Sequence, residues 1–169
     1  MAGNFLGSTR GIIKGLLPVI LILALASAAG AAAAGKAADF NLPDILQGKN
    51  YTLSQFQGKV VMINFFTFNC MPCREEMPDL NNIYKENQGK GFQTLGIALS
   101  SDPVQIRFLV KQMGLTYPVL TGNDQVSKDY GNVEVVPTTF IIDKQGKIVH
   151  KILGTRKKEE FVKMIQALL

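Results

Sequence analysis

The stretch "NFFTFNCMPCREEMPDL", residues 64–80, contains both cysteines of the chain, Cys70 and Cys73. It overlaps the continuous apolar run "VVMINFF" at 60–66, whose length and β-branched residues predict a strand buried on both faces. Apolar residues at helical spacing then predict a helix over 75–90. The two cysteines therefore lie where a buried strand meets a helix, and they could bind a metal, hold the fold together or carry out redox chemistry.

Two of these possibilities fit the sequence poorly. A structural zinc site needs four ligands, and the chain offers one cysteine pair and a single histidine, His150, which we expect to face solvent from a strand. A structural disulfide gains stability with the length of the loop that it closes, and two intervening residues close almost nothing. The pattern thus favours a redox-active pair.

The position of the pair also suits redox chemistry. A thiolate at Cys70 would meet the free N–H groups and the positive dipole end of the following helix. Cys73 lies one turn further on and can reach the first sulfur. Pro72 is suited to a first helical turn because its missing N–H costs nothing there. Met71, between the cysteines, is expected to point outward, onto the surface that a partner meets.

The rest of the chain alternates strands with helices around this junction. Continuous or alternating apolar runs predict strands over 92–100, 138–143 and 148–153, and an N-terminal hairpin that turns at 48–50. Three further helices are expected: one capped by Asp102 with Val104, Phe108, Leu109 and Met113 on its apolar face, a short one ending at Gly131, and a closing one over 157–169 with Phe161, Met164, Ile165 and Leu168 inward. The order predicts an α/β fold with a mixed central sheet flanked by helices.

Residues 1–35 are expected to be a leader separate from the domain at 36–169. Arg10 and Lys14 precede 21 uncharged residues, 15–35. These fit a signal peptide with a cleavage site at residues 26–28, which we favour slightly, or an uncleaved anchor, since about 20 helical residues cross a bilayer. Either alternative exports the domain.

The charge of the domain excludes one class of partner. The chain has 18 basic and 13 acidic side chains, and two of the basic ones fall in the leader, which leaves 16 against 13. The lysines are scattered, and no basic run is interleaved with aromatic residues. We therefore expect no nucleic-acid binding.

A second motif, "VPTTFIIDKQGKIV" at 136–149, makes the assignment more specific. Together with residues 64–80 and the N-terminal "FNLPDILQGKNYTLSQFQGK", it resembles thioredoxin-fold proteins, and more closely the exported TlpA/ResA-type thiol–disulfide oxidoreductases. The resemblance covers roughly residues 38–169. The 64 positions from Cys73 to Pro137 exceed the spacing in thioredoxin by about one strand–helix unit, an insertion typical of this subfamily.

The resemblance implies roles for individual residues. Pro137 would follow a cis bond and face the disulfide, while backbone groups at Val136 bind an extended segment of the partner, next to Met71 and Pro72. Cys70 would be the nucleophile and Cys73 the resolving thiol. Glu76 would accept and return a proton of Cys73, or be an ordinary solvated side chain of the first turn. No cofactor is implied beyond the redox-active disulfide.

Two positions distinguish this chain within the group. Asn64 stands where thioredoxin has a buried acid, as is common in the subfamily. Asn69 stands where the family usually has a tryptophan, so an aromatic part of the partner-binding surface is missing.

The resemblance suggests a function in the exported compartment. The domain would reduce disulfides of partner proteins, such as apocytochrome c or copper-site proteins, and a membrane thiol carrier would re-reduce it. A disulfide-forming oxidant and a non-catalytic, redox-sensitive binding module are the alternatives.

Overall fold

The computed structural model describes residues 35–169, so the expected leader over 1–35 lies outside the described residues except for Gly35. No helix within 35–169 is long and apolar enough to cross a membrane. The strands are β1 (Asn41–Pro43), β2 (Asn50–Thr52), β3 (Val60–Phe66), β4 (Phe92–Ala98), β5 (Val119–Thr121), β6 (Thr138–Ile142) and β7 (Ile148–Leu153). The helices are α1 (Met71–Asn87), α2 (Pro103–Gln112), α3 (Asp124–Asp129) and α4 (Lys158–Gln166), with short 3₁₀ turns at Leu53–Phe56 and Gln88–Lys90.

Strands β3 to β7 form one mixed sheet in the order β5-β4-β3-β6-β7. The central strand β3 runs parallel to β4 and antiparallel to β6. Every residue of β3 and β4 is buried, as the continuous apolar runs predict. The predicted mixed α/β sheet and the N-terminal hairpin of β1 and β2 are therefore confirmed.

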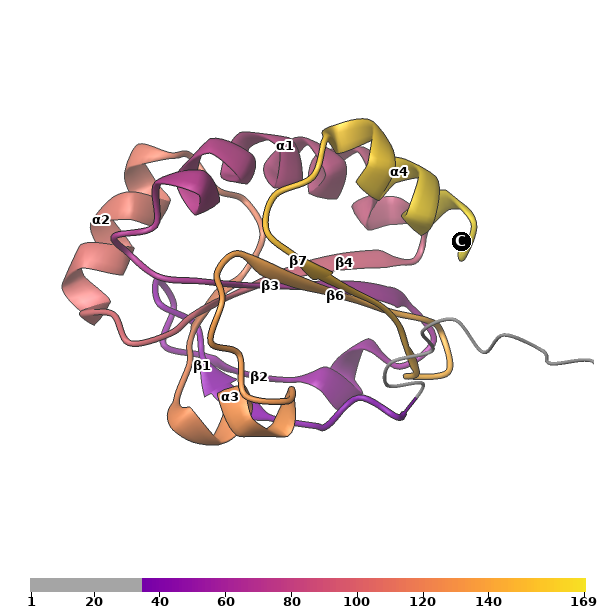
Figure 1. The fold of residues 1–169 in the computed structure, drawn as a ribbon, viewed down its shortest axis with the longest axis horizontal. Coiled ribbons are helices and arrows are strands. Elements are labelled where there is room, and N and C mark those ends of the chain that lie inside the picture. Colours follow the sequence, from indigo (N-terminus) through magenta and orange to yellow (C-terminus); the bar gives the residue numbers. More distant parts are fainter. Residues whose placement is uncertain (1–34) are drawn as a thin grey trace, which may run out of the picture. The chain divides into compact units, whose positions relative to one another are not determined.

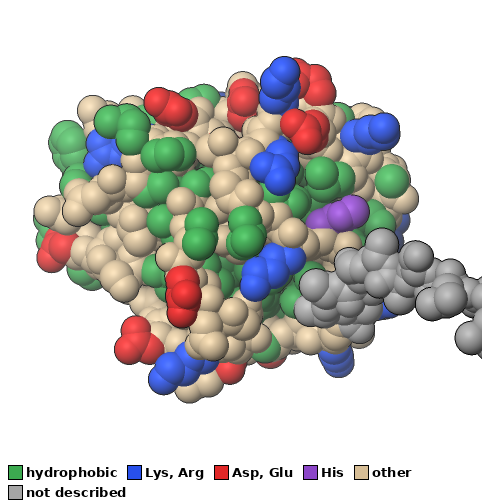
Figure 2. All heavy atoms as spheres, viewed as in Figure 1, with side chains coloured by type: hydrophobic (Ala, Val, Ile, Leu, Met, Phe, Trp, Pro, Cys, Tyr) green, Lys and Arg blue, Asp and Glu red, His purple; other side chains and the backbone are tan. Residues whose placement is uncertain are grey.

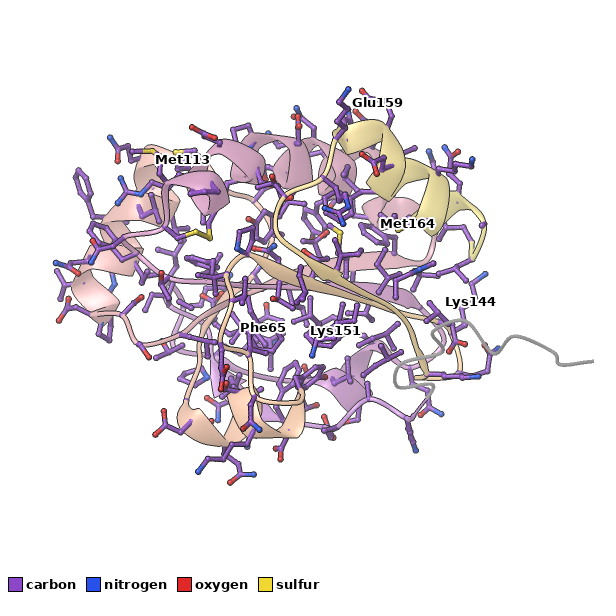
Figure 3. All side chains as sticks on the ribbon, in the orientation of Figure 1. Phe65, Met113, Lys144, Lys151, Glu159 and Met164 are labelled. Atoms are coloured by element: carbon purple, nitrogen blue, oxygen red, sulfur yellow. A yellow bond between two sulfur atoms is a disulfide. The ribbon has the colours of Figure 1, made fainter. Side chains whose placement is uncertain are left out.

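The sheet is covered on both faces (Figure 1). Helices α1 and α4 lie on one face, while the β1–β2 hairpin and α3 lie on the other. Alternate residues of β3 supply the two cores: Met62 and Phe66 pack with the first layer, Ile63 and Phe65 with the second. Figure 3 shows Phe65 below the sheet, where it contacts Tyr130 and Phe140.

Helix α2 corrects the sequence prediction of its buried face. Asp102 caps the helix as expected, through bonds from the N–H groups of residues 104 and 105. The residues that pack inward are Ile106, Leu109 and Val110, whereas Val104 and Phe108 are 71% and 63% exposed. The apolar residues of this helix lie on more than one face. Contact with the neighbouring layer buries a different face from the predicted one.

The other boundaries differ in smaller ways. Helix α1 begins at Met71, four residues before the predicted start, and runs through Pro78 as one element to Asn87. Strand β4 ends at Ala98 rather than at residue 100. In α4, Phe161 and Ile165 are buried as predicted, while Met164 and the following Leu168 are half-buried against the same core.

Candidate redox site

Cys70 and Cys73 form a disulfide at the start of α1, with their Cα atoms 5.3 Å apart. Cys70 is the N-cap residue, and its sulfur accepts a hydrogen bond from the backbone N–H of Cys73 at 3.2 Å. Pro72 lies in the first helical turn, as predicted. The first turn contains no acidic residue, and its free N–H groups and dipole act on Cys70.

The two sulfur-bearing residues differ in their access to solvent. Cys73 is buried, with 1% of its surface exposed, whereas Cys70 is half-buried. Met71 is 63% exposed and points outward, as predicted from its place between the cysteines. A partner sulfur can therefore approach the Cys70 side of the disulfide but is kept from Cys73.

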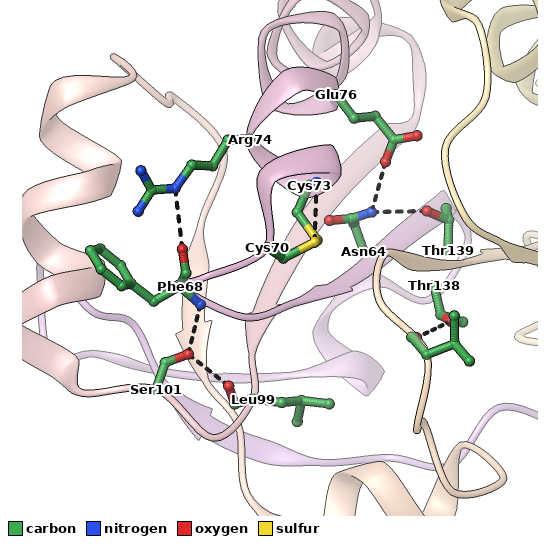
Figure 4. Close-up of a disulfide and its surroundings, with 11 residues drawn as sticks. Asn64, Phe68, Cys70, Cys73, Arg74, Glu76, Leu99, Ser101, Thr138 and Thr139 are labelled. Atoms are coloured by element: carbon green, nitrogen blue, oxygen red, sulfur yellow. Dashed lines mark hydrogen bonds between the residues drawn. A yellow bond between two sulfur atoms is a disulfide. The ribbon is translucent and has the colours of Figure 1, made fainter.

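A buried chain of polar groups lies behind the disulfide (Figure 4). Asn64 donates from Nδ2 to Glu76 Oε2 at 3.2 Å and to Thr139 Oγ1 at 2.9 Å. The other oxygen of Glu76, Oε1, accepts from the backbone N–H of Arg156 at 3.0 Å. The chain thus joins α1 to β3, β6 and the segment before α4.

Glu76 is not a solvated side chain, because only 4% of its surface is exposed. Burial raises the pKa of this carboxyl above its usual value, and the hydrogen bonds from Arg156 and Asn64 offset part of that rise. Glu76 follows Cys73 by three residues on the same helix, so the two side chains share a face. A carboxyl whose pKa is raised in this way keeps its proton to higher pH than an exposed glutamate does.

The loop before β6 places Pro137 at the same end of the sheet. The Val136–Pro137 peptide bond is cis, as the resemblance implies. Thr138 follows directly and lies opposite Phe65 in the β3–β6 register. Val136 packs against the apolar core that includes Cys73. His150 is exposed on β7, as predicted, and is not part of this site.

Three contacts that fix the loop before Cys70 were not predicted. The N–H of Phe68 donates to Ser101 Oγ at 2.9 Å, and Arg74 Nε donates to the Phe68 carbonyl at 3.1 Å. The Arg74 guanidinium also lies 4.6 Å from the centroid of the Phe68 ring. Arg74 follows Cys70 by four residues, about one helical turn. This spacing was the sign in the sequence that the Arg74 side chain contacts the loop before the helix.

The buried polar chain was also only partly foreseen. Asn64 is the single polar residue in the apolar run 60–66, and a polar group in a buried strand needs a hydrogen-bond partner. That signal indicated a partner without identifying it. Thr139 and Arg156 could not be assigned to the site, because they follow Asn64 by 75 and 92 positions in the chain.

The fold and this half-accessible cysteine pair define a thioredoxin-like thiol–disulfide oxidoreductase. The Redoxin family model matches residues 32–168, and the chain belongs to that family. It is 37% identical over 133 residues to the thiol-disulfide oxidoreductase ResA of Geobacillus thermodenitrificans, with 78% of this chain and 75% of that protein covered.

Solved structures show the same similarity. A putative thiol:disulfide interchange protein DsbE from Chlorobium tepidum superposes with a TM-score of 0.75 at 30% identity, covering 81% of this chain and 97% of that one. A secreted thiol-disulfide isomerase from Corynebacterium glutamicum superposes with a TM-score of 0.73 at 27% identity, covering 78% and 83%. The predicted family and fold are thereby confirmed.

Proposed function

We propose that this protein is an exported reductase of disulfides in partner proteins. The observation that carries the proposal is the unequal burial of the pair, with Cys70 accessible at a helix N-terminus and Cys73 enclosed. The secreted Corynebacterium relative and the uncharged segment 15–35 support export, either by a cleaved signal peptide or with residues 1–35 as an anchor.

The reaction begins from the reduced pair. The Cys70 thiolate attacks one sulfur of a partner disulfide, a Cys70–partner bond forms, and the second partner sulfur leaves as a thiolate. Cys73 then loses its proton to the Glu76 carboxylate and attacks Cys70. The Cys70–Cys73 bond forms, and the first partner sulfur leaves and takes up a proton. The partner gains two electrons and the pair loses two.

The partner segment would lie across the residues around the pair. Backbone groups of Val136 beside Pro137 bind it in an extended form, and Met71 and Pro72 form the surface next to the attacking sulfur. Met71 and Pro72 are exposed, which suits this role. Suitable partners are proteins that need free cysteines to bind a haem or copper, such as apocytochrome c, and a membrane thiol carrier would return the electrons.

The reduction potential tests the direction of the reaction. The protein is equilibrated with glutathione buffers, and its reduced fraction is measured by thiol alkylation. A reductase is expected near the thioredoxin value of about −270 mV, whereas a value near −120 mV is that of a strong oxidant and would reverse the proposed direction. A protein that exchanges no disulfide with glutathione or insulin would instead be a non-catalytic module.

A further inference from the structure

A β-turn leads directly into the cysteine pair. Cys70 donates its N–H to the Thr67 carbonyl at 3.3 Å, so Phe68 and Asn69 occupy the two central positions of this turn. Neither central residue has a positive φ angle. A type II turn needs a positive φ at its second central residue, so the turn has the type I form.

A turn of this kind can change form by rotation of its middle peptide, here the peptide between Phe68 and Asn69. The second central residue has φ of about −90° in type I and about +80° in type II. The rotation reverses the Phe68 carbonyl and the Asn69 N–H while the ends of the turn stay in place. Bulky and β-branched residues oppose a positive φ, but asparagine tolerates it. The residue at position 69 therefore leaves both forms open.

Arg74 holds the peptide that would rotate. Its Nε donates to the Phe68 carbonyl at 3.1 Å, and its guanidinium lies 4.6 Å from the centroid of the Phe68 ring (Figure 4). The accepting carbonyl belongs to the middle peptide of the turn, and it would point the opposite way in the type II form. Because hydrogen bonds from charged donors are stronger than neutral ones, this contact favours the type I form.

The peptide on the other side of Phe68 is fixed in a different way. The Phe68 N–H donates to Ser101 Oγ at 2.9 Å, and the Ser101 hydroxyl donates to the Leu99 carbonyl at 2.7 Å. These bonds tie the turn to the segment after β4. They are compatible with both forms, because rotation of the middle peptide does not move this N–H. Among these contacts, the one from Arg74 distinguishes the two forms.

The side chain of Arg74 has no other partner that explains its position. Within residues 35–169 it forms no ion pair, and it is half-buried against the turn. An arginine supplies a fixed Nε donor and a planar group that stacks on a ring, and a lysine supplies neither. The contact with Phe68 uses both properties.

We propose that Arg74 is a positioning residue that keeps the turn 67–70 in the type I form, so that Asn69 presents one fixed surface beside Cys70. Asn69 is exposed and directly precedes the attacking cysteine. In the other form its N–H would point the opposite way at the surface that a partner disulfide meets. A turn that populates both forms is competent only part of the time, which lowers kcat/KM by that fraction. The inference rests on the reductase function proposed above and adds a residue that acts through the turn.

The test is a double-mutant cycle between Arg74 and position 69. Arg74→Gln is introduced into the full chain with Asn69, with Asn69→Val and with Asn69→Gly. Valine disfavours a positive φ and holds the type I form by itself, whereas glycine admits both forms. The readout is the factor by which Arg74→Gln lowers kcat/KM for insulin reduction in each background. A direct effect of residue 69 on the partner cancels in this factor.

The expected factor is about three- to tenfold with Asn69, because only part of the population keeps the competent form. It should fall within about twofold of one with Asn69→Val and exceed the original factor with Asn69→Gly. Arg74→Lys should behave like Arg74→Gln, because it keeps the charge but loses the planar fork. The matched control is Arg107→Gln, which should leave kcat/KM unchanged: Arg107 Nε also donates to a backbone carbonyl, that of Ile45 at 3.2 Å, but from α2.

NMR of the full chain reports the form of the turn without any substrate. A strong NOE between the Phe68 Hα and the Asn69 N–H marks the type II form, because rotation of the middle peptide brings these two protons together. This NOE should be weak in the unmodified protein and stronger in Arg74→Gln. It should be weak again when Asn69→Val is added.

Three results would overturn the inference: equal factors in the three backgrounds, full activity of Arg74→Lys, or a turn that stays type I in Arg74→Gln. Failure of the unmodified protein to reduce insulin is a different result, which would reject the proposed reductase function. The NMR comparison would then still decide whether Arg74 controls the turn.

Discussion

The two ends of the central sheet have opposite surface character. The disulfide end, where β3 and β4 finish, has the exposed Met71 and the buried Glu76. The other end, where the same strands start, is rich in lysine. Figure 2 shows that basic side chains also occur elsewhere on the surface. Lys59 lies directly before β3, and Lys90 lies shortly before β4. Lys144 and Lys147 lie in the β6–β7 turn, and Lys36 forms a β-bridge with Lys147.

The difference shows where this fold can hold chemistry. The seven residues of β3 place the two ends about 23 Å apart, at 3.3 Å per residue. This separation is more than two Debye lengths at physiological salt, so the lysines act weakly on the thiols. The sheet supplies a rigid support, and the segments beyond its strand ends supply the reactive groups. Substitutions at the two ends should therefore have very different effects.

The largest effect is expected at Cys73. Cys73→Ser should abolish turnover, because the resolving thiol is lost and the partner stays bound to Cys70 as a mixed disulfide. Non-reducing gels of the variant expressed in its host should show this adduct. The control, Cys70→Ser, should show none, because Cys73 is buried. An adduct formed only by the Cys70 variant would reverse the two assignments.

A smaller loss of rate is expected at Glu76. Glu76→Gln should slow release of the mixed disulfide by about 10²-fold or somewhat less, since general acid–base help is typically worth 10²–10⁴-fold and water can replace part of it. Glu75→Gln is the matched control, because Glu75 is exposed and adjacent. Rates are measured by stopped flow from pH 5 to 9. Equal behaviour of the two variants would remove Glu76 from the mechanism.

Glu76 should also make stability depend on pH. Its folded-state pKa is raised by burial, so the folded state holds the proton more tightly than the unfolded state. The contribution of Glu76 to the free energy of unfolding is then largest below the ordinary pKa of 4.5. It is lost as pH rises through the folded-state pKa. Each unit by which folding raises the pKa of Glu76 lowers the free energy of unfolding at high pH by about 1.4 kcal/mol.

Urea unfolding between pH 4 and 8 measures this dependence. Glu76→Gln should flatten the plot of unfolding free energy against pH over that range, because an amide does not titrate. Glu75→Gln should leave the shape of this plot unchanged. A parallel slope in the Glu76 variant and the unmodified protein would show that other groups cause the dependence.

The smallest effects are expected at the lysine-rich end. Lys59→Gln and Lys147→Gln should change the rate with a soluble disulfide less than about twofold, because screening weakens charges at this distance. Their effect on the free energy of unfolding should stay within about 0.5 kcal/mol, as is usual for surface substitutions. A tenfold change in rate would mean that the two ends of the sheet are coupled.

Much of the fold and the reactive pair could be predicted because the signals are local. The apolar run 60–66 specifies a buried strand, and the apolar spacing after it specifies a helix, although the predicted start of that helix is four residues too late. The cysteine spacing excludes most other chemistry. The motif at 136–149 gave the cis-proline loop through its resemblance to a family, since most X-Pro bonds are trans and the bond type does not follow from the residues alone.

The errors and omissions come from contacts between distant segments. Helix α2 has apolar residues on several faces, and only packing against the sheet decided that Val104 and Phe108 face outward. Glu76 could be placed next to Cys73 on the helix, but its burial depended on Asn64 and on the backbone of Arg156.

The sequence by itself therefore determined the strand–helix junction, the cysteine pair and the class of reaction, because these depend on residues within about twenty positions of one another. Tertiary structure decided which cysteine is accessible, whether Glu76 is buried, and which apolar side chains remain exposed. Burial is a property of all the segments that pack together, and the segments that enclose Cys73 and Glu76 come from β3, β6 and the approach to α4.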